Sequence, residues 1–237
     1  MEKPCIMLLA LAILSQLEIK LSHLMNIVIL LGPPGCGKGT QALQASKALS
    51  IPHISTGDLL RENIKNGTAL GKEMKSYIDS GRLGPDNLVL AMLFDRLSQP
   101  DCEKGYLLDG FPRTIPQAEA LDEYLTSRGK AKVINLKCSD ESVIKRISGR
   151  LTCSSCGALY NKHFSPPKNE KQCDLCGSSL MQRADDQEEI VQERLRVYKR
   201  QTEPLIEFYK SKNLLKEING ENARDLVYRD LMHAILG

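Results

Sequence analysis

A glycine-rich segment between a short apolar run and a helical pattern constrains the fold of this chain more than any other feature. Residues 26–31 (NIVILL) suit a strand buried on both faces, and residues 32–38 (GPPGCGK) match the spacing G-x-x-x-x-G-K. Glycines in such a loop let backbone N–H groups turn inward around phosphate oxygens, and the following helix N-terminus adds partial positive charge. We therefore predict a nucleoside triphosphate site in which Lys38 contacts the β- and γ-phosphates.

The rest of the chain alternates between apolar runs and helical patterns, which favours a parallel sheet covered by helices on both faces. The predicted fold class is therefore α/β, a three-layer P-loop fold with a central parallel sheet. Pro204 should break the last helix. Strands are expected at 26–31, 106–108, 133–136 and 214–218, and helices at 38–49, 86–98, 115–127, 140–149 and 186–210.

Two stretches do not follow this alternation, and we interpret both as inserts on the sheet domain. Residues 55–84 hold two short helical segments around Gly67 and Gly71, without a strand pattern. Residues 151–183 are rich in Cys, Gly, Pro, Ser and Asn and have almost no helical period. We take the second insert to extend over 151–186.

The first 24 residues are treated apart from the domain, which we place at 25–237. Their apolar run, residues 6–14, is far shorter than the roughly 20 residues that span a bilayer. As a signal peptide the segment lacks a net basic start and a small-x-small cleavage site. We interpret residues 1–24 as an N-terminal extension that need not belong to the mature protein.

The overall charge excludes some classes of partner. The 237 residues carry a net charge of +3, too little to indicate binding to nucleic acid or to an anionic membrane. With 42% hydrophobic and 26% charged residues, the composition is that of an ordinary soluble globular protein. We expect a monomer whose partners are small molecules.

A kinase, unlike a hydrolase, needs a second substrate site, and two segments supply candidates. Residues 55–61 (STGDLLR) look like a helix start in which Arg61 follows about one turn after the cap. Residues 109–113 (DGFPR) follow the predicted strand 106–108, so Asp109 stands where open α/β sheets bind their ligands. A carboxylate there can hold hydrated Mg²⁺ against the β- and γ-phosphates.

Several arginines come from separate segments beside these motifs. The guanidinium group is a planar fork that binds phosphate oxygens bidentately, and phosphoryl transfer depends mainly on positioning and charge stabilisation. For any one arginine alone, a solvated surface role is the simpler interpretation, so the argument depends on their joint placement. The set is Arg61, Arg113, Arg146, Arg150, Arg183 and Arg194.

Four of the eight cysteines form two C-x-x-C pairs separated by sixteen residues, which is the spacing of a zinc site. Four thiolates leave no open position on the metal, so the zinc would be structural. A chain of this length can build its own core without disulfides, which favours a reducing compartment, and we expect the cytoplasm. The predicted ligands are Cys153, Cys156, Cys173 and Cys176.

Taken together, these motifs resemble the adenylate kinase family. The resemblance rests on GPPGCGKGT (32–40), STGDLLR (55–61), LDGFPRT (108–114) and RADD (183–186), and it extends from Met25 to the C-terminus. The common P-loop motif has Ser or Thr directly after its lysine, whereas this chain has Gly39 and then Thr40; the family pattern G-K-G-T has the same arrangement.

The resemblance implies a role for each motif. The insert 55–84 would bind AMP, and the insert 151–186 would be a lid whose folding depends on zinc because it is too small to bury a core. The amide of Gln117 could read an adenine edge, and Asp185 and Asp186 would help to close the lid. Catalytic roles are implied for Lys38, Arg113, Arg150, Arg183 and Arg194. ATP would contact Gly35, Cys36, Gly37, Lys38, Gly39, Thr40, Arg146, Arg150, Leu159 and Tyr160. AMP would contact Thr56, Arg61, Arg82, Leu83, Gly84, Gly110, Phe111, Pro112, Arg113, Gln117, Arg183 and Arg194.

Two other functions remain open from the residues alone. A kinase for UMP or CMP would carry a similar loop and DGFPR segment, although the long four-cysteine insert favours adenylate kinase. A nucleotide-dependent switch or a zinc-ribbon nucleic-acid binder would not need the second phosphate site, and the stretch 157–172 between the cysteine pairs is not notably basic.

Overall fold

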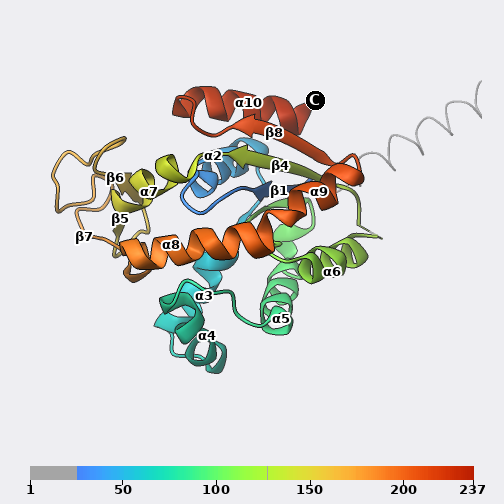
Figure 1. The fold of residues 1–237 in the computed structure, drawn as a ribbon, viewed down its shortest axis with the longest axis horizontal. Coiled ribbons are helices and arrows are strands. Elements are labelled where there is room, and N and C mark those ends of the chain that lie inside the picture. Colours follow the sequence, from blue (N-terminus) through green and yellow to red (C-terminus); the bar gives the residue numbers. More distant parts are fainter. Residues whose placement is uncertain (1–25, 127) are drawn as a thin grey trace, which may run out of the picture.

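The computed structural model describes residues 26–126 and 128–237 (Figure 1). The predictions made for residues 1–24, and for the last residue of the helix predicted at 115–127, lie outside the described residues. Within the described part of the chain, no helix combines the length and the apolar composition needed to cross a membrane.

The core of the molecule is a five-stranded sheet in which every pairing is parallel, and this confirms the predicted fold class. The strand order is β2-β3-β1-β4-β8, so the strand that precedes the glycine-rich loop lies in the centre. The second strand was missed because it is only three residues long. The strands are β1 (Asn26–Leu31), β2 (His53–Ser55), β3 (Gly105–Asp109), β4 (Ala131–Lys137) and β8 (Leu215–Asn219).

Helices cover both faces of the sheet, as Figure 1 shows. Most of the predicted helices are present within a few residues of their expected bounds, whereas the C-terminal helix was not predicted. The α-helices are α2 (Lys38–Leu49), α3 (Thr56–Lys65), α4 (Ala69–Asp79), α5 (Asp86–Leu97), α6 (Ile115–Leu125), α7 (Asp140–Ser148), α8 (Glu188–Val197), α9 (Pro204–Ser211) and α10 (Arg224–Leu236). Short 3₁₀ turns cover Pro100–Cys102 and Ala184–Asp186.

The alternation of side chains along β1 creates the two cores. Ile27, Ile29 and Leu31 pack into one cluster with residues of α5, α6 and α9. Val28 and Leu30 point to the opposite face and pack with residues of α2 and α10. Because successive side chains of a strand point to opposite faces, a continuous apolar run requires a partner layer on each side. The result is the predicted three-layer arrangement.

The predicted break at Pro204 is confirmed, and it has a specific form. Residues Tyr198–Thr202 make a π-helical segment between α8 and α9, in which the Glu203 N–H donates to the Tyr198 carbonyl at 2.9 Å. Pro204 then opens α9 as its first residue. Proline lacks an N–H and is tolerated only in the first turn of a helix, so the chain must restart there.

Two regions project from the sheet domain (Figure 1). Helices α3 and α4 pack against each other within the stretch 55–84, and Ser55 caps α3 by accepting from the Asp58 N–H at 3.2 Å. A small antiparallel sheet of order β6-β5-β7 begins one residue before the stretch 151–186 and otherwise lies within it. Its strands are β5 (Arg150–Cys153), β6 (Leu159–Asn161) and β7 (Leu180–Met181).

Candidate active site

The glycine-rich loop connects β1 to α2 and lies against α7. A Cβ atom at Gly35 would lie 2.4 Å from Cγ1 of Ile147, and the backbone there has φ of 77°, so this position requires glycine. Arg146, one residue earlier on α7, donates from Nη1 to the Cys36 carbonyl at 2.9 Å. The ammonium of Lys38 donates to the carbonyls of Gly32 and Pro33, each at 2.8 Å. Gly35, Lys38 and Arg146, three of the residues predicted to contact ATP, therefore lie at one loop at the N-terminus of a helix.

Asp109 stands at the C-terminal end of β3, beside this loop. A Cβ atom on Gly39 would lie 3.2 Å from Oδ2 of Asp109, and the Nε2 atom of His53 is 3.5 Å from the same oxygen. Burial acts to raise the pKa of the Asp109 carboxyl, but the polar contact with the His53 ring and the charge of Lys38 outweigh burial, and the pKa lies below its usual range. An ionised carboxylate at this place suits hydrated Mg²⁺, which keeps most of its waters.

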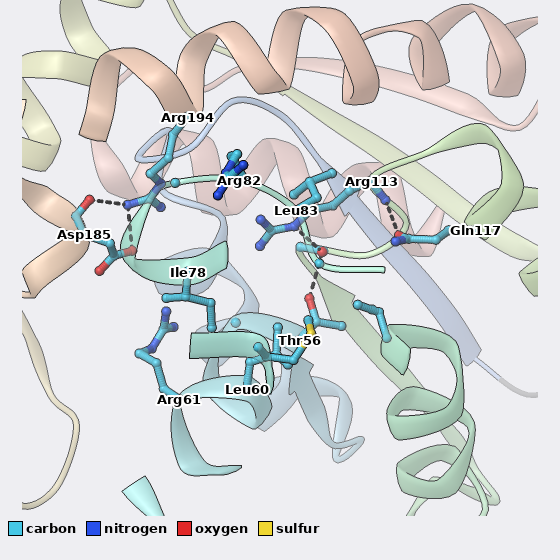
Figure 2. Close-up of a pocket in the computed structure, with 16 residues that line it drawn as sticks. Thr56, Leu60, Arg61, Ile78, Arg82, Leu83, Arg113, Gln117, Asp185 and Arg194 are labelled. Atoms are coloured by element: carbon cyan, nitrogen blue, oxygen red, sulfur yellow. Dashed lines mark hydrogen bonds and ion pairs between the residues drawn. The ribbon is translucent and has the colours of Figure 1, made fainter. Parts of the chain in front are cut away.

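A pocket lies next to Asp109, between the helical insert, the DGFPR segment and the end of the lid insert (Figure 2). It brings together most of the residues that the resemblance implies for AMP, although they come from distant parts of the sequence. These are Thr56, Arg61, Arg82, Leu83, Gly84, Gly110, Arg113, Gln117 and Arg194. Phe111 and Pro112 are buried beneath the pocket and are joined by a cis peptide bond.

Hydrogen bonds hold the floor of this pocket together. The hydroxyl of Thr56 donates to the Gly110 carbonyl at 2.8 Å, and Nε of Arg113 donates to the same oxygen at 2.7 Å. The backbone N–H of Arg113 donates to Oε1 of Gln117 at 2.8 Å. These hydrogen bonds therefore fix the side chains that would bind a phosphate and a base relative to one another (Figure 2).

The arginines of the lid region are held by two buried carboxylates. Arg150 forms a bidentate pair with Asp186, whose side chain is fully buried. Arg194 donates from Nη1 to Oδ2 of Asp185 at 2.8 Å and also lies 3.4 Å from Asp186. The sequence analysis expected both aspartates to help close the lid. What the structure adds is that they neutralise arginines at the base of the insert.

Arg183 connects the lid region to the helical insert. Its Nε donates to the Thr152 hydroxyl at 3.1 Å, and its Nη2 lies 4.0 Å from the Asp58 carboxylate. Asp58 also pairs with Arg61 at 2.6 Å. Neither Thr152 nor Asp58 was identified from the sequence, although Asp58 belongs to the STGDLLR motif itself.

Crowding of positive charge perturbs these arginines. Burial, followed by the charge of Arg194, lowers the pKa of Arg113 to about 10. Burial, followed by the charges of Arg61 and Arg150, lowers the pKa of Arg183 to about 10. Both remain protonated at neutral pH, but their charged forms are disfavoured. An anion bound among these side chains would relieve that repulsion, so the electrostatics favour a phosphate ligand.

Removal of the buried carboxylate of Asp186 should destabilise the protein. We expect Asp186→Ala to cost about 3 kcal/mol, because it leaves the guanidinium of Arg150, which is largely shielded from solvent, without its partner. For a chain of this size, that corresponds to a fall in Tm of about 6–12 °C by calorimetry. Glu193→Ala, which breaks the surface pair Arg196–Glu193 on α8, should change Tm by less than about 2 °C. Equal shifts for both variants would contradict this assignment.

The four predicted zinc ligands meet at the tip of the lid insert. Their Sγ atoms all lie within 4.8 Å of one another, with 3.4 Å between Cys153 and Cys176 and 3.6 Å between Cys156 and Cys173. Four sulfurs at about 2.3 Å from one tetrahedral zinc would be about 3.8 Å apart. In each pair the glycine after the second cysteine donates its N–H to the carbonyl of the first. The residues present therefore fit structural zinc.

Leu159 and Tyr160, which were predicted near the base or ribose of ATP, form part of β6. Leu159 is exposed, and the Tyr160 hydroxyl lies 3.5 Å from Sγ of Cys173 and accepts from the Asp174 N–H at 2.8 Å. Tyr160 thus supports the cysteine cluster in this conformation. Its contact with ATP stays a prediction.

Comparison with known proteins identifies relatives along nearly the whole domain. The sequence model of the family described as Adenylate kinase matches residues 30–214. A curated adenylate kinase from Methanocella arvoryzae is 57% identical over 209 residues, which cover 87% of this chain and 97% of the relative. An adenylate kinase from Archaeoglobus fulgidus is 52% identical over 209 residues, which cover 87% of this chain and 96% of the relative. One from Clostridium perfringens is 52% identical over 206 residues, which cover 86% of this chain and 95% of the relative.

Proposed function

The chain belongs to the adenylate kinase family, and from that premise we propose which residues bind each substrate and which stabilise the transferred group. The reaction is the reversible transfer of the terminal phosphoryl group of ATP to AMP, which gives two molecules of ADP. The observation that carries the proposed division of roles is the pocket of arginines beside Asp109 and the phosphate loop, because it supplies a second anion site next to the first.

On the ATP side, the backbone N–H groups of residues 35–40 surround the phosphates, and Lys38 contacts the β- and γ-phosphates. The ammonium of Lys38 exchanges its present contacts with the Gly32 and Pro33 carbonyls for phosphate oxygens. Arg146 fixes the loop through the Cys36 carbonyl. These groups orient the γ-phosphorus toward the arginine pocket.

On the AMP side, the phosphate is bound by Arg61 and Arg113, and Arg82 lies at the rim of the same pocket. Leu83 and Gly84 form the wall beside the base. One hydrogen of the Gln117 amide and one lone pair of its oxygen remain available, because each end of the amide makes one contact in the structure. They can read the edge of adenine.

The transferring group lies between the two sites, where Arg150, Arg183 and Arg194 gather. We propose that these arginines share their hydrogen bonds between the present partners and the phosphoryl oxygens as the lid insert closes. Closure also excludes water, which would otherwise compete with AMP as the acceptor. The transfer is direct and in line, because no covalent enzyme intermediate is required for phosphoryl transfer between two bound nucleotides.

Two metals complete the proposal. Asp109 would hold Mg²⁺ through water, and Mg²⁺ supplies neutralisation of the charge on the β- and γ-phosphates. The four cysteines would hold zinc, which supplies the folding energy of the lid insert. Because those thiols must stay reduced, we propose a cytoplasmic location, and we propose that the enzyme acts as a monomer, since both nucleotide sites lie within one chain.

Measured turnover with different acceptors tests the AMP assignment. We expect the chain to produce ADP from ATP and AMP with a kcat/KM at least about 100-fold higher than with CMP, UMP or GMP, because one hydrogen-bonded base edge can separate acceptors by that factor or more. A coupled assay for nucleoside diphosphate formation makes the comparison directly. Preference for UMP or CMP would instead support a pyrimidine monophosphate kinase.

A further inference from the structure

A carboxylate that the sequence analysis did not single out lies behind the amide of Gln117. Asp86 is the first residue of α5 and reaches across to the start of α6. Its Oδ1 accepts from Nε2 of Gln117 at 2.6 Å, and its Oδ2 accepts from the Thr114 hydroxyl at 3.0 Å. Both carboxylate oxygens therefore have a donor, and each donor comes from the first turn or cap of α6.

The hydroxyl of Thr114 is compatible with this arrangement. It accepts from the Gln117 backbone N–H at 3.3 Å as the cap of α6, which leaves its single proton for Asp86. Every hydrogen bond in this network therefore joins a donor to an acceptor. Asp86 accepts twice, Thr114 accepts once and donates once, and the Gln117 amide donates to Asp86.

Two neighbours together fix which way the amide of Gln117 faces. The Arg113 backbone N–H can only donate, so it requires the oxygen Oε1 at 2.8 Å. The Asp86 carboxylate can only accept, so it requires the nitrogen Nε2. A rotation of the amide by 180° would place a donor against a donor and an acceptor against an acceptor. The orientation is thus set by chemistry on both sides of a side chain that is only 2% exposed.

The orientation matters because purine bases differ in the sign of their hydrogen-bonding groups. Adenine offers an amino donor at position 6 and an acceptor at N1, whereas hypoxanthine and guanine offer an acceptor at position 6 and a donor at N1. An amide with Oε1 and Nε2 fixed can match only one of these patterns, and a freely rotating amide can match both.

We propose that Asp86 is a positioning residue that makes the enzyme specific for adenine in its monophosphate substrate, by holding the Gln117 amide in one orientation. This rests on the proposed function, in which Gln117 faces the base of AMP. Asp86 itself does not line the arginine pocket and acts through Gln117. Because the Arg113 N–H favours the same orientation, loss of Asp86 removes part of the discrimination and leaves the remainder.

The test compares AMP with IMP, the latter measured both as an acceptor and as a competitive inhibitor against AMP. For Asp86→Ala we expect about a tenfold rise in KM for AMP and about a tenfold fall in the AMP-to-IMP ratio of kcat/KM or of binding constants. That is the loss of one hydrogen bond to a charged partner. The kcat at saturating AMP and the KM for ATP should stay within about twofold.

Three further variants separate positioning from a merely structural role. Asp86→Asn keeps an oxygen for Gln117 and a nitrogen that can donate to Thr114, so the ratio should return to within about threefold of the unchanged enzyme. Adding Asp86→Ala to Gln117→Ala should not change the ratio further, because the effect passes through Gln117. Asp95→Ala, which removes an exposed carboxylate from the same helix, should have no effect. If Asp86→Ala does not fold, Asp86→Ser takes its place, with the same expected fall.

Two results would overturn the proposal. One is an unchanged AMP-to-IMP ratio in Asp86→Ala, or in Asp86→Ser where that variant takes its place. The other is an equal loss for both nucleotides, or an additive loss in the Gln117→Ala background, since either would show a structural role only. Failure of the proposed function is a different result, in which the unchanged enzyme forms no ADP from ATP and AMP.

Discussion

Replacing Arg113 with alanine is expected to lower kcat for ADP formation by about 10³-fold while leaving the fold intact. The guanidinium of Arg113 lines the arginine pocket and is held toward it by its Nε contact with the Gly110 carbonyl. Phosphoryl transfer depends mainly on positioning and charge stabilisation, and an arginine that holds a reacting phosphate can supply about three to five powers of ten in rate; we take the lower figure because other arginines remain.

The fold should tolerate this change because the folded structure keeps the charge of Arg113 in an unfavourable environment. Burial and the charge of Arg194 lower its pKa to about 10, so its removal relieves repulsion within the arginine cluster. We expect Tm to change by less than about 3 °C. Arg113→Lys keeps the positive charge but loses the planar guanidinium that can bind phosphate oxygens bidentately, so it should recover only part of the rate.

Arg229→Ala is the matched control, because Arg229 lies exposed on α10 and contacts only Asp230 at 3.5 Å in the described structure. It should leave kcat unchanged within about twofold. A near-normal rate for Arg113→Ala, measured by the same coupled assay, would contradict the placement of AMP phosphate in this pocket.

Loss of the metal from the four-cysteine cluster is the second large effect that we expect. The purified chain should contain one zinc per molecule, and Cys153→Ser should abolish this binding and unfold the lid insert. Structural zinc contributes on the order of 10 kcal/mol to the folding of small metal-bound units. The lid insert contributes only Leu151 and two of its own cysteines to the buried apolar residues, so it has little other source of stability.

Three measurements check this result on the same sample. Metal analysis should show loss of zinc, limited proteolysis should cleave within 154–181, and ADP formation should fall because Arg183 is no longer placed. Cys138→Ser, outside the cluster, should keep one zinc and normal protease resistance. Full resistance of Cys153→Ser to cleavage would show that the lid folds without metal.

Much of the site could be predicted from the sequence because its parts are local motifs with fixed spacing. The phosphate loop, the helix start at Ser55, the DGFPR segment and the cysteine pairs each bring their own residues together over a few positions. A short stretch of sequence is enough to predict such a motif, because neighbouring residues set both its chemistry and its turn geometry. The structure confirms the parallel sheet that carries them.

Other features depend on contacts between distant segments and left no local pattern. The three-residue strand β2 exists because it pairs with β3, and α10 is stabilised by packing against α2 and against strands β4 and β8. Asp86 looks like any acidic residue in the first turn of a helix until Gln117, 31 positions later, is placed against it.

The sequence by itself indicated a P-loop site for a nucleoside triphosphate, candidates for a second phosphate site, and four cysteines at the spacing of a zinc site. Only the tertiary structure decided how the arginines converge, which carboxylates hold them, and which way the amide of Gln117 faces. The physical reason is that hydrogen bonds and charge interactions act over a few ångströms in space, and residues far apart in the chain reach that range only after the sheet and its inserts have folded.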